Sequence, residues 1–306
     1  MDPRTFLKAL YRAAVFAVEP GRLVAEALSR RGNAVVIRSV SDPGRREFVF
    51  VPRRVVLLSV GKAAVAMASA AHRALGTLVD DSLVIAPAGS LHEELPPGCR
   101  YLPAAHPVPD DRSLAAGQAA LSLAAGLGPE DLLLVLLSGG GSSLMALPAE
   151  TVSLADKART VSLLSAAGAP IADINVVRGT LSRVKGGRLA AAARTADVVT
   201  LVLSDLGDDG WHLVASGPTL GAPPSRRDAS SILENYRLLS LVPPSVRQYL
   251  LSPRQEVGPL DGGQRWSVLL GDIRTALEGA RREAQRLGAD VRVLPELLAG
   301  EARSAS

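Results

Sequence analysis

A loop of serine and glycine residues follows the most apolar segment of this sequence. The apolar residues 132–137 run without alternation, which is typical of a strand buried on both faces of a parallel sheet. The loop directly after them consists of Ser138, Gly139, Gly140, Gly141, Ser142 and Ser143. Because glycine leaves backbone N–H groups unobstructed, such a loop suits a phosphate or a carboxylate. A mobile turn without a ligand is the alternative, but the position after a strand favours a site.

A lysine stands at a second strand end. Gly61 and Lys62 follow a predicted buried strand at 55–60 and open a predicted helix, so Lys62 can reach phosphate oxygens near a helix N-terminus. The segment is not a Walker A loop, because Ala63 replaces the serine or threonine and no glycine precedes it at the required spacing. A solvated lysine at a helix start explains the pattern equally well.

A third segment, 175–188, concentrates positive charge around two adjacent glycines. Its cationic residues are Arg178, Arg183, Lys185 and Arg188. Arginine side chains bind carboxylates and phosphates through two parallel hydrogen bonds, so this segment can line an anion site. A solvated basic helix face is the competing interpretation, which the residues by themselves favour.

Acidic residues follow another predicted strand, at 196–204. Asp205 comes at its end, with Asp208 and Asp209 shortly after. A carboxylate in this position can hold Mg²⁺ beside a polyphosphate. Aspartate also favours turns, so the later pair carries less weight. The small-residue turn at 216–219 is expected near the same edge of the sheet.

The elements around these segments alternate between strands and helices. Strands are predicted at 55–60, 83–86, 100–102, 131–137 and 196–204. Helices are predicted at 63–75, 113–125, 153–167 and 171–182. This alternation predicts an α/β fold with a doubly wound, Rossmann-like and mainly parallel sheet covered by helices on both faces.

The remaining segments flank this core. Before it we expect two helices within 3–30, broken at Pro20, and a hairpin of strands 34–40 and 48–51 joined by a turn at 41–44. After it we expect a strand at 266–270, a helix at 273–287 and a strand at 291–294. The predicted division is a domain at 1–240 with its Rossmann-like core at about 53–220, then a connection and partial second α/β domain at 241–306.

Composition narrows the class of protein. The chain has 306 residues and a net charge of +4, but its arginines are scattered and not interleaved with aromatic residues, which disfavours nucleic-acid binding. Cys99 is the only cysteine, so an intrachain disulfide and a cysteine metal cluster are excluded. No apolar stretch of the sequence is long enough to span a bilayer, and the first residues lack the apolar run of a signal peptide. These features predict a cytoplasmic protein.

Six segments together resemble the MOFRL-type glycerate 2-kinases, a family that also carries the older label hydroxypyruvate reductase. They are 59–68, 106–110, 136–148, 175–190, 204–209 and 214–219. The resemblance runs in the same order over nearly the whole chain. It implies the MOFRL-associated N-terminal domain of an enzyme that transfers the γ-phosphoryl group of ATP to the 2-hydroxyl of D-glycerate, with Mg²⁺.

The resemblance also implies roles for individual residues. Lys62 would contact the transferring phosphate, and the 138–143 loop would cradle a phosphate or the glycerate carboxylate. Arg178, Lys185 and Arg188 would line the cleft. Asp205 would lie near Mg²⁺. The catalytic residues would then be Lys62, Arg178 and Asp205.

Departures from the family pattern leave other functions open. The sequence has Ala86 to Ser90 where the family has a lysine and a Gly-His pair, and Gly179-Thr180 where it has a basic residue and a histidine. The family's second, MOFRL domain of roughly a hundred residues is also absent from this sequence. This pattern predicts a truncated or split gene product, with a separately encoded MOFRL domain or a second copy of the chain as partner, or a paralogue with altered function.

Two other functions compete with the kinase. The departures favour a non-catalytic anion-binding or partner domain. A hydroxypyruvate reductase is disfavoured because no GxGxxG dinucleotide motif occurs in the sequence. We further expect the partners of the strands within 266–294 to lie largely in the second domain.

Overall fold

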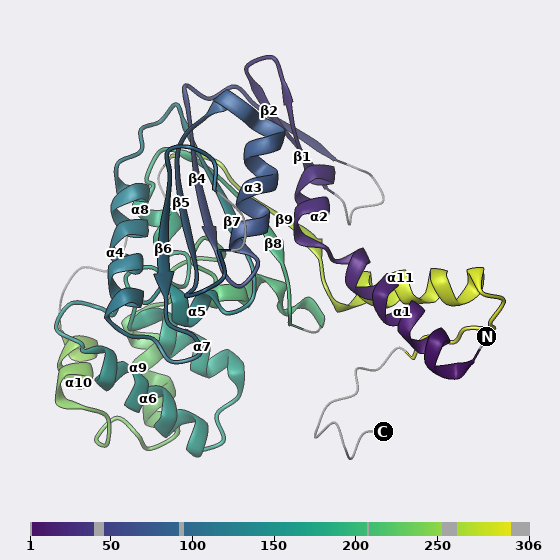
Figure 1. The fold of residues 1–306 in the computed structure, drawn as a ribbon. Coiled ribbons are helices and arrows are strands. Elements are labelled where there is room, and N and C mark those ends of the chain that lie inside the picture. The colour runs from purple at the N-terminus through teal and green to yellow at the C-terminus, as the bar shows by residue number, and fades with distance from the viewer. Residues whose placement is uncertain (1, 40–45, 92–94, 207, 253–261, 295–306) are drawn as a thin grey trace.

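A six-stranded parallel sheet forms the centre of the molecule. The computed structural model describes residues 2–39, 46–91, 95–206, 208–252 and 262–294. The sheet has the order β6-β5-β4-β7-β8-β9 (Figure 1). Its strands are β4 (Arg54–Val60), β5 (Val79–Pro87), β6 (Cys99–Ala104), β7 (Asp131–Leu137), β8 (Asp197–Leu203) and β9 (Arg265–Gly271). The predicted α/β class with a doubly wound sheet is confirmed.

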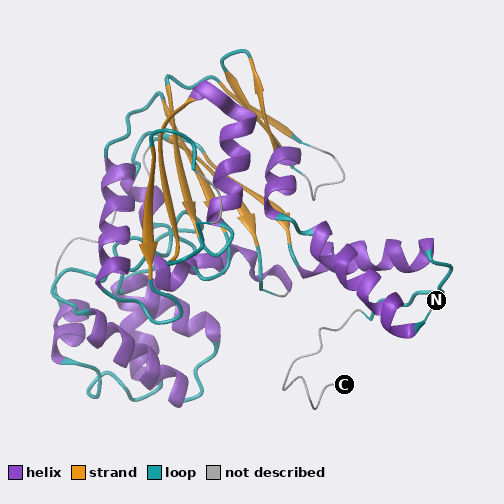
Figure 2. Ribbon diagram, viewed as in Figure 1, coloured by secondary structure: helices purple, strands orange, loops and turns teal. Residues whose placement is uncertain are grey.

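The uninterrupted apolar run of β7 reflects burial on both sheet faces. Its even-numbered leucines, such as Leu134, pack with helices α2 (Pro20–Ala27) and α3 (Ala64–Leu75), whereas odd-numbered residues such as Val135 pack with α4 (Asp111–Ala125). Helix α8 (Arg188–Ala192) lies on the α4 side. Each fully buried leucine or valine contributes about 1.5–3 kcal/mol, so this strand anchors both layers (Figure 2).

Shorter elements surround the sheet at its amino-terminal side. Strands β1 (Leu28–Arg31), β2 (Ala34–Arg38) and β3 (Glu47–Phe50) form a separate antiparallel sheet. The hairpin of β2 and β3 was predicted, but its turn at 41–44 lies outside the described residues. The prediction that the helical region extends to residue 30 is wrong, because Leu28 begins β1 and pairs with Ile37.

Helix α1 (Pro3–Ala17) packs against α11 (Ile273–Arg286), and both project away from the central sheet (Figure 1). The two helices approach closely at Gly279, where a Cβ would lie 2.5 Å from the Ala17 side chain. Two helices from nearly opposite ends of the described chain thus form one layer.

The carboxyl-terminal strand prediction needs two corrections. Strand β9 pairs with β8 in the central sheet, with Val198 opposite Arg265, so the expectation that its partners lie largely in another domain is wrong. Residues 291–294 form no strand. The sheet ends at β9. Residues 291–294 instead line an apolar groove along α11, together with Leu10. The division of domains at residue 240 stays a prediction, and the central sheet runs across it.

A helical cluster lies beneath the carboxyl ends of the strands (Figure 1). It consists of α6 (Leu154–Ala166), α7 (Ile171–Thr180), α9 (Arg226–Asn235) and α10 (Pro244–Leu251), which share an apolar core of their own. Three short helices complete the fold: η1 (Gly76–Leu78), α5 (Gly141–Leu144) and η2 (Asp208–Ser216). None of the helices within the described ranges has the length and apolar character needed to cross a membrane.

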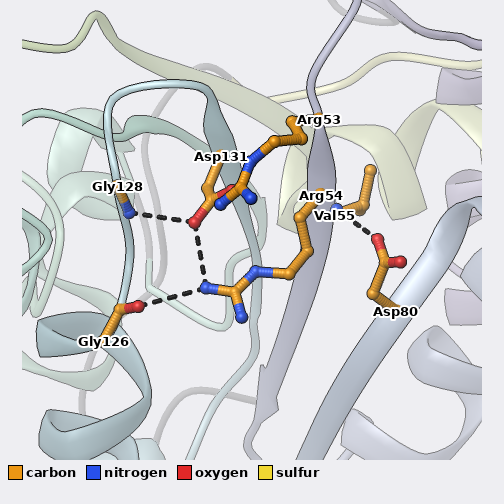
Figure 3. Close-up of polar contacts among 7 residues, drawn as sticks. All are labelled: Arg53, Arg54, Val55, Asp80, Gly126, Gly128 and Asp131. Carbon is orange, nitrogen blue, oxygen red and sulfur yellow. Dashed lines mark hydrogen bonds and ion pairs between the residues drawn. The ribbon is translucent and has the colours of Figure 1, made fainter.

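The amino edge of the sheet carries a closed ion-pair cluster (Figure 3). The Asp131 carboxylate is 1% exposed and accepts hydrogen bonds from Arg54 at 2.9 Å and from the Gly128 N–H at 2.9 Å. Arg53 lies 3.4 Å away as a second cation. Burial opposes ionisation, but these hydrogen bonds and charges outweigh it and lower the pKa of Asp131. The cluster therefore fixes β4 against β7 at their starts.

Candidate functional site

The strand order creates a crevice between β4 and β7. From β4 the chain moves outward to β5 and β6, whereas from β7 it moves the opposite way to β8 and β9. Loops that leave two adjacent strands in opposite directions open a crevice, and open α/β sheets bind their ligands there. The register pairs Val60 with Leu137, so the loop containing Lys62 lies beside the 138–143 loop.

Backbone hydrogen bonds join these two loops. The Ser138 N–H donates to the Val60 carbonyl at 3.0 Å, and the Lys62 N–H donates to the Gly139 carbonyl at 2.9 Å. The Ser138 hydroxyl accepts from the Ala63 N–H at 3.1 Å. The loops are thus set in place by the sheet itself.

Two glycines of the loop allow charged and aromatic side chains to approach the backbone. A Cβ on Gly139 would lie 2.1 Å from the Asp205 carboxylate. A Cβ on Gly140, whose φ is +86°, would lie 3.0 Å from the His106 ring and 3.2 Å from the Lys62 side chain. The glycines therefore bring Lys62, His106 and Asp205 to one short segment of backbone.

The second half of the loop is tied to the turn after η2. The hydroxyls of Ser142 and Ser216 lie 2.7 Å apart, and Ala215 and Ser216 both have left-handed φ values, of 55° and 61°. Non-glycine residues in that region carry strain, which is common at functional sites. The backbone of this turn also accepts hydrogen bonds from the Gly186 and Gly187 N–H groups.

Lys185 is buried against these two segments. Its side chain is almost fully enclosed, and its ammonium donates to the carbonyls of Ser142 at 2.8 Å and Ala215 at 3.4 Å. Burial, assisted by the positive charge of Arg178, lowers the pKa of Lys185 to about 7. Lys185 therefore holds the loop and adds a titratable positive charge behind it.

A second buried lysine lies on helix α6. Lys157 is 7% exposed, and its Nζ has no hydrogen-bond partner among the described residues. Burial, followed by the charges of Lys185, Arg178 and Arg188, lowers its pKa well below the ordinary value. A buried cation without a partner is costly, which marks this position for a ligand.

Two cavities meet at the loop. The first has a volume of about 370 Å³ and is lined by Asp205, Asn175 and Ser216 among others. The second has a volume of about 480 Å³ and is lined by Lys157, Lys185 and His106 together with apolar residues of α6. Gly140, Ser142 and Arg178 line both cavities. The Arg178 guanidinium is held by Asn175 at 3.2 Å, and burial lowers its pKa.

The structure brings together most of the residues singled out in the sequence. Arg178, Lys185, Asp205 and part of the 138–143 loop line the two cavities, whereas Lys62 lies beside Gly140 without lining either cavity. Arg188 does not line either one. Its guanidinium donates to the carbonyls of Gly179 at 3.0 Å and Pro224 at 2.9 Å, and it borders a separate cavity.

Among the side chains that the structure describes, the carboxylate that lines the first cavity is that of Asp205, which is exposed. No group of three His, Cys, Asp or Glu side chains suited to a metal ion occurs in the part of the chain that the structure describes. The side chains of Asp208 and Asp209 lie outside that part. One carboxylate is nonetheless compatible with Mg²⁺, because this ion is usually bound by one or two carboxylates plus substrate phosphates.

Sequence reasoning missed two residues of the site. His106 lies in a segment that carried the family resemblance, yet no role was assigned to it. Lys157 was not singled out at all. A signal was present, since Leu154, Lys157, Ala158 and Val161 have the spacing of one helix face, which places a lysine among apolar residues.

The fold and the site define a class of protein: a doubly wound α/β protein with a crevice lined by cationic side chains at its topological switch point. The particular family follows from comparison. The family model "Domain of unknown function (DUF4147)" matches residues 6–251. The chain therefore belongs to the DUF4147 family.

Known relatives cover nearly the whole chain. Human "Glycerate kinase" is 36% identical over 96% of this chain, and "Glycerate 2-kinase" of Pyrococcus horikoshii is 34% identical over 100% of it. The crystal structure of a glycerate kinase from Thermotoga maritima aligns with a TM-score of 0.75 at 33% identity, over 94% of this chain and 64% of that one. The chain spans 58% of the human relative and 68% of the Pyrococcus relative.

Proposed function

We propose that this chain carries the substrate cleft of an ATP-dependent glycerate 2-kinase, which forms 2-phosphoglycerate and ADP from D-glycerate and ATP. The observation that carries the proposal is the meeting of Lys62, Lys157, Arg178 and Lys185 at one glycine loop, in a relative of glycerate kinases. Both substrates are anions. Phosphoryl transfer depends on positioning and charge neutralisation more than on covalent chemistry, which such a site supplies.

The residues divide the work by their positions. Lys62 and the N–H groups of the 138–143 loop neutralise the transferring phosphoryl group, because both lie at the crevice. Arg178 lines both cavities, so its guanidinium can bind the phosphoryl group before and after the transfer. Asp205 would hold Mg²⁺, which when bound neutralises charge on the phosphate oxygens.

The proposed function also requires a second domain that closes the cleft. Phosphoryl transfer requires a cleft that excludes water, and the described residues leave both cavities partly open to solvent. Resemblance implies a MOFRL domain in that place, provided by the same protein, a separate chain or a second copy. The partial coverage of the relatives supports this arrangement.

The test is a phosphorylation assay with ATP, Mg²⁺ and D-glycerate, read by ADP release and by ³¹P NMR of the product. The chain is assayed with and without a separately expressed MOFRL domain from a relative. We expect a phosphate on the 2-hydroxyl and faster turnover with the added domain. NADH oxidation with hydroxypyruvate in place of phosphorylation would instead support a reductase.

A further inference from the structure

Lys157 has a position that the proposed kinase function does not by itself explain. It lies on α6, outside the glycine loop, and its ammonium is enclosed without a hydrogen-bond partner among the described residues. Two other cations, Lys185 and Arg178, line the same cavity. Gathering like charges in a buried place destabilises the folded protein. An anion bound beside Lys157 would offset this cost.

The two cavities differ in the anion that each can take. Among the described residues, the lining of the cavity at Lys157 contains cations but no carboxylate, so this cavity suits an anion that arrives without a metal ion. Much of its remaining lining is apolar, with Leu154, Val161 and Pro109 among the lining residues, which suits the carbon end of a small organic acid. The other cavity contains Asp205, which repels a bare carboxylate but accepts a phosphate that carries Mg²⁺.

We propose that the cavity between α6 and the 138–143 loop binds the carboxylate of the hydroxy-acid acceptor, with Lys157 as its charge partner. The nucleotide phosphates then occupy the Asp205 cavity. The acceptor hydroxyl and the γ-phosphoryl group meet at Gly140, Ser142 and Arg178, which line both cavities. This assignment rests on the proposed function for the identity of the acceptor, but not for the presence of an anion pocket.

The experiment compares binding of D-glycerate and of ATP by ligand-observed NMR and calorimetry, in phosphate-free buffer. In Lys157→Met and Lys157→Gln we expect D-glycerate affinity to fall about 10- to 100-fold, as for loss of a charged hydrogen bond, with ATP affinity within about threefold of wild type. Lys8→Met is the matched control, since Lys8 is an exposed lysine on α1. It should leave both affinities unchanged.

Two further readouts separate a ligand role from a structural one. Because Lys157 has no partner to lose, Lys157→Met should raise the melting temperature of the unliganded chain, by about 2 °C or more. A structural lysine would lower it. At pH 8, D-glycerate binding should take up protons in wild type, because an anion raises the pKa of a neighbouring lysine. Lys157→Met should reduce that uptake.

The outcomes are distinct. Loss of ATP binding with unchanged D-glycerate binding in the Lys157 variants would overturn the proposal, as would unchanged binding of both. Failure of D-glycerate to bind wild type, with Lys157-dependent binding of D-lactate, would support the carboxylate pocket and refute the glycerate kinase assignment. If neither acid binds wild type, the pocket itself is refuted.

Discussion

The two edges of the central sheet handle buried charge in opposite ways. At the amino edge, Asp131 is enclosed and paired with Arg54 and Arg53 (Figure 3). At the carboxyl edge, Lys157 and Lys185 line one cavity, and neither forms an ion pair with any residue that the structure describes. The Asp131 carboxylate thus has its partners within the protein, which are the two arginines and the Gly128 N–H. In our proposal a ligand supplies the missing negative charge at the carboxyl edge, where the lysines would serve binding at the expense of stability.

The largest effect should come from opening the amino edge. Asp131→Asn leaves Arg54 and Arg53 without their carboxylate, and breaking a buried pair typically costs 3–5 kcal/mol. Because the Arg54 side chain is 39% exposed, we expect about 2–3 kcal/mol after allowance for solvent screening. Urea unfolding measures this loss.

A matched surface pair serves as the control for that change. Asp81 and Arg100 lie 3.3 Å apart with exposed side chains, so Asp81→Asn should cost less than about 0.5 kcal/mol. Anion binding should be unchanged in both variants. An Asp131→Asn variant as stable as wild type would show that the amino edge is not held by its charges.

A smaller effect is expected from pH at the carboxyl edge. The pKa of Lys185 is about 7 in the folded protein and near the ordinary 10.5 when unfolded. Between these values the unfolded chain binds more protons, so the free energy of unfolding rises with pH from 7 towards 10. Lys157 acts in the same direction, and Arg178 and Arg188 keep their charge over this range.

Urea unfolding at pH 7 and pH 9, in the absence of anions, measures this slope. For wild type we expect a gain on the order of 1–2 kcal/mol, and a clearly smaller gain for Lys185→Met. A flat profile in wild type would mean that the lysine is stabilised by interactions that keep its pKa high.

The smallest change in stability should come from Lys62→Ala. Lys62 is exposed, so the free energy of unfolding should stay within about 0.5 kcal/mol of wild type. Its position against Gly140 predicts that ATP affinity falls about tenfold. Paired melting and ATP titration test both halves. A large drop in melting temperature with unchanged titration would give Lys62 a structural role.

The sequence predicted best those elements whose pattern of apolar residues is uniform. The apolar run of β7 predicted a strand buried on both faces, and the glycine loop after it could therefore be placed at the carboxyl edge. The helix prediction for Leu28 was wrong because this apolar residue continues the helical spacing of α2, although it begins strand β1. The strand prediction for residues 291–294 was wrong because residues that favour strands form one only where a neighbouring strand can pair with them.

The site was predictable only in part for a related reason. The positions of Lys62 and Asp205 follow from strand ends, whereas the strand order that places β4 beside β7 is a tertiary property. Arg188 looked equivalent to Lys185 in the sequence. The Arg188 guanidinium instead donates to the carbonyls of Gly179 and Pro224, away from the two cavities. No local sequence pattern predicts these two hydrogen bonds.

The packing of α1 on α11 has a consequence for synthesis. The first helix is finished at Ala17, but its partner begins only at Ile273. At about 5–20 residues per second on the ribosome, α1 waits on the order of 10–50 s for that partner. Its side chains Leu7, Tyr11 and Phe16 remain exposed even in the folded chain. Helix α1 thus reaches its final position only after about 250 further residues have been made, and during that interval its apolar surface is open to chaperones.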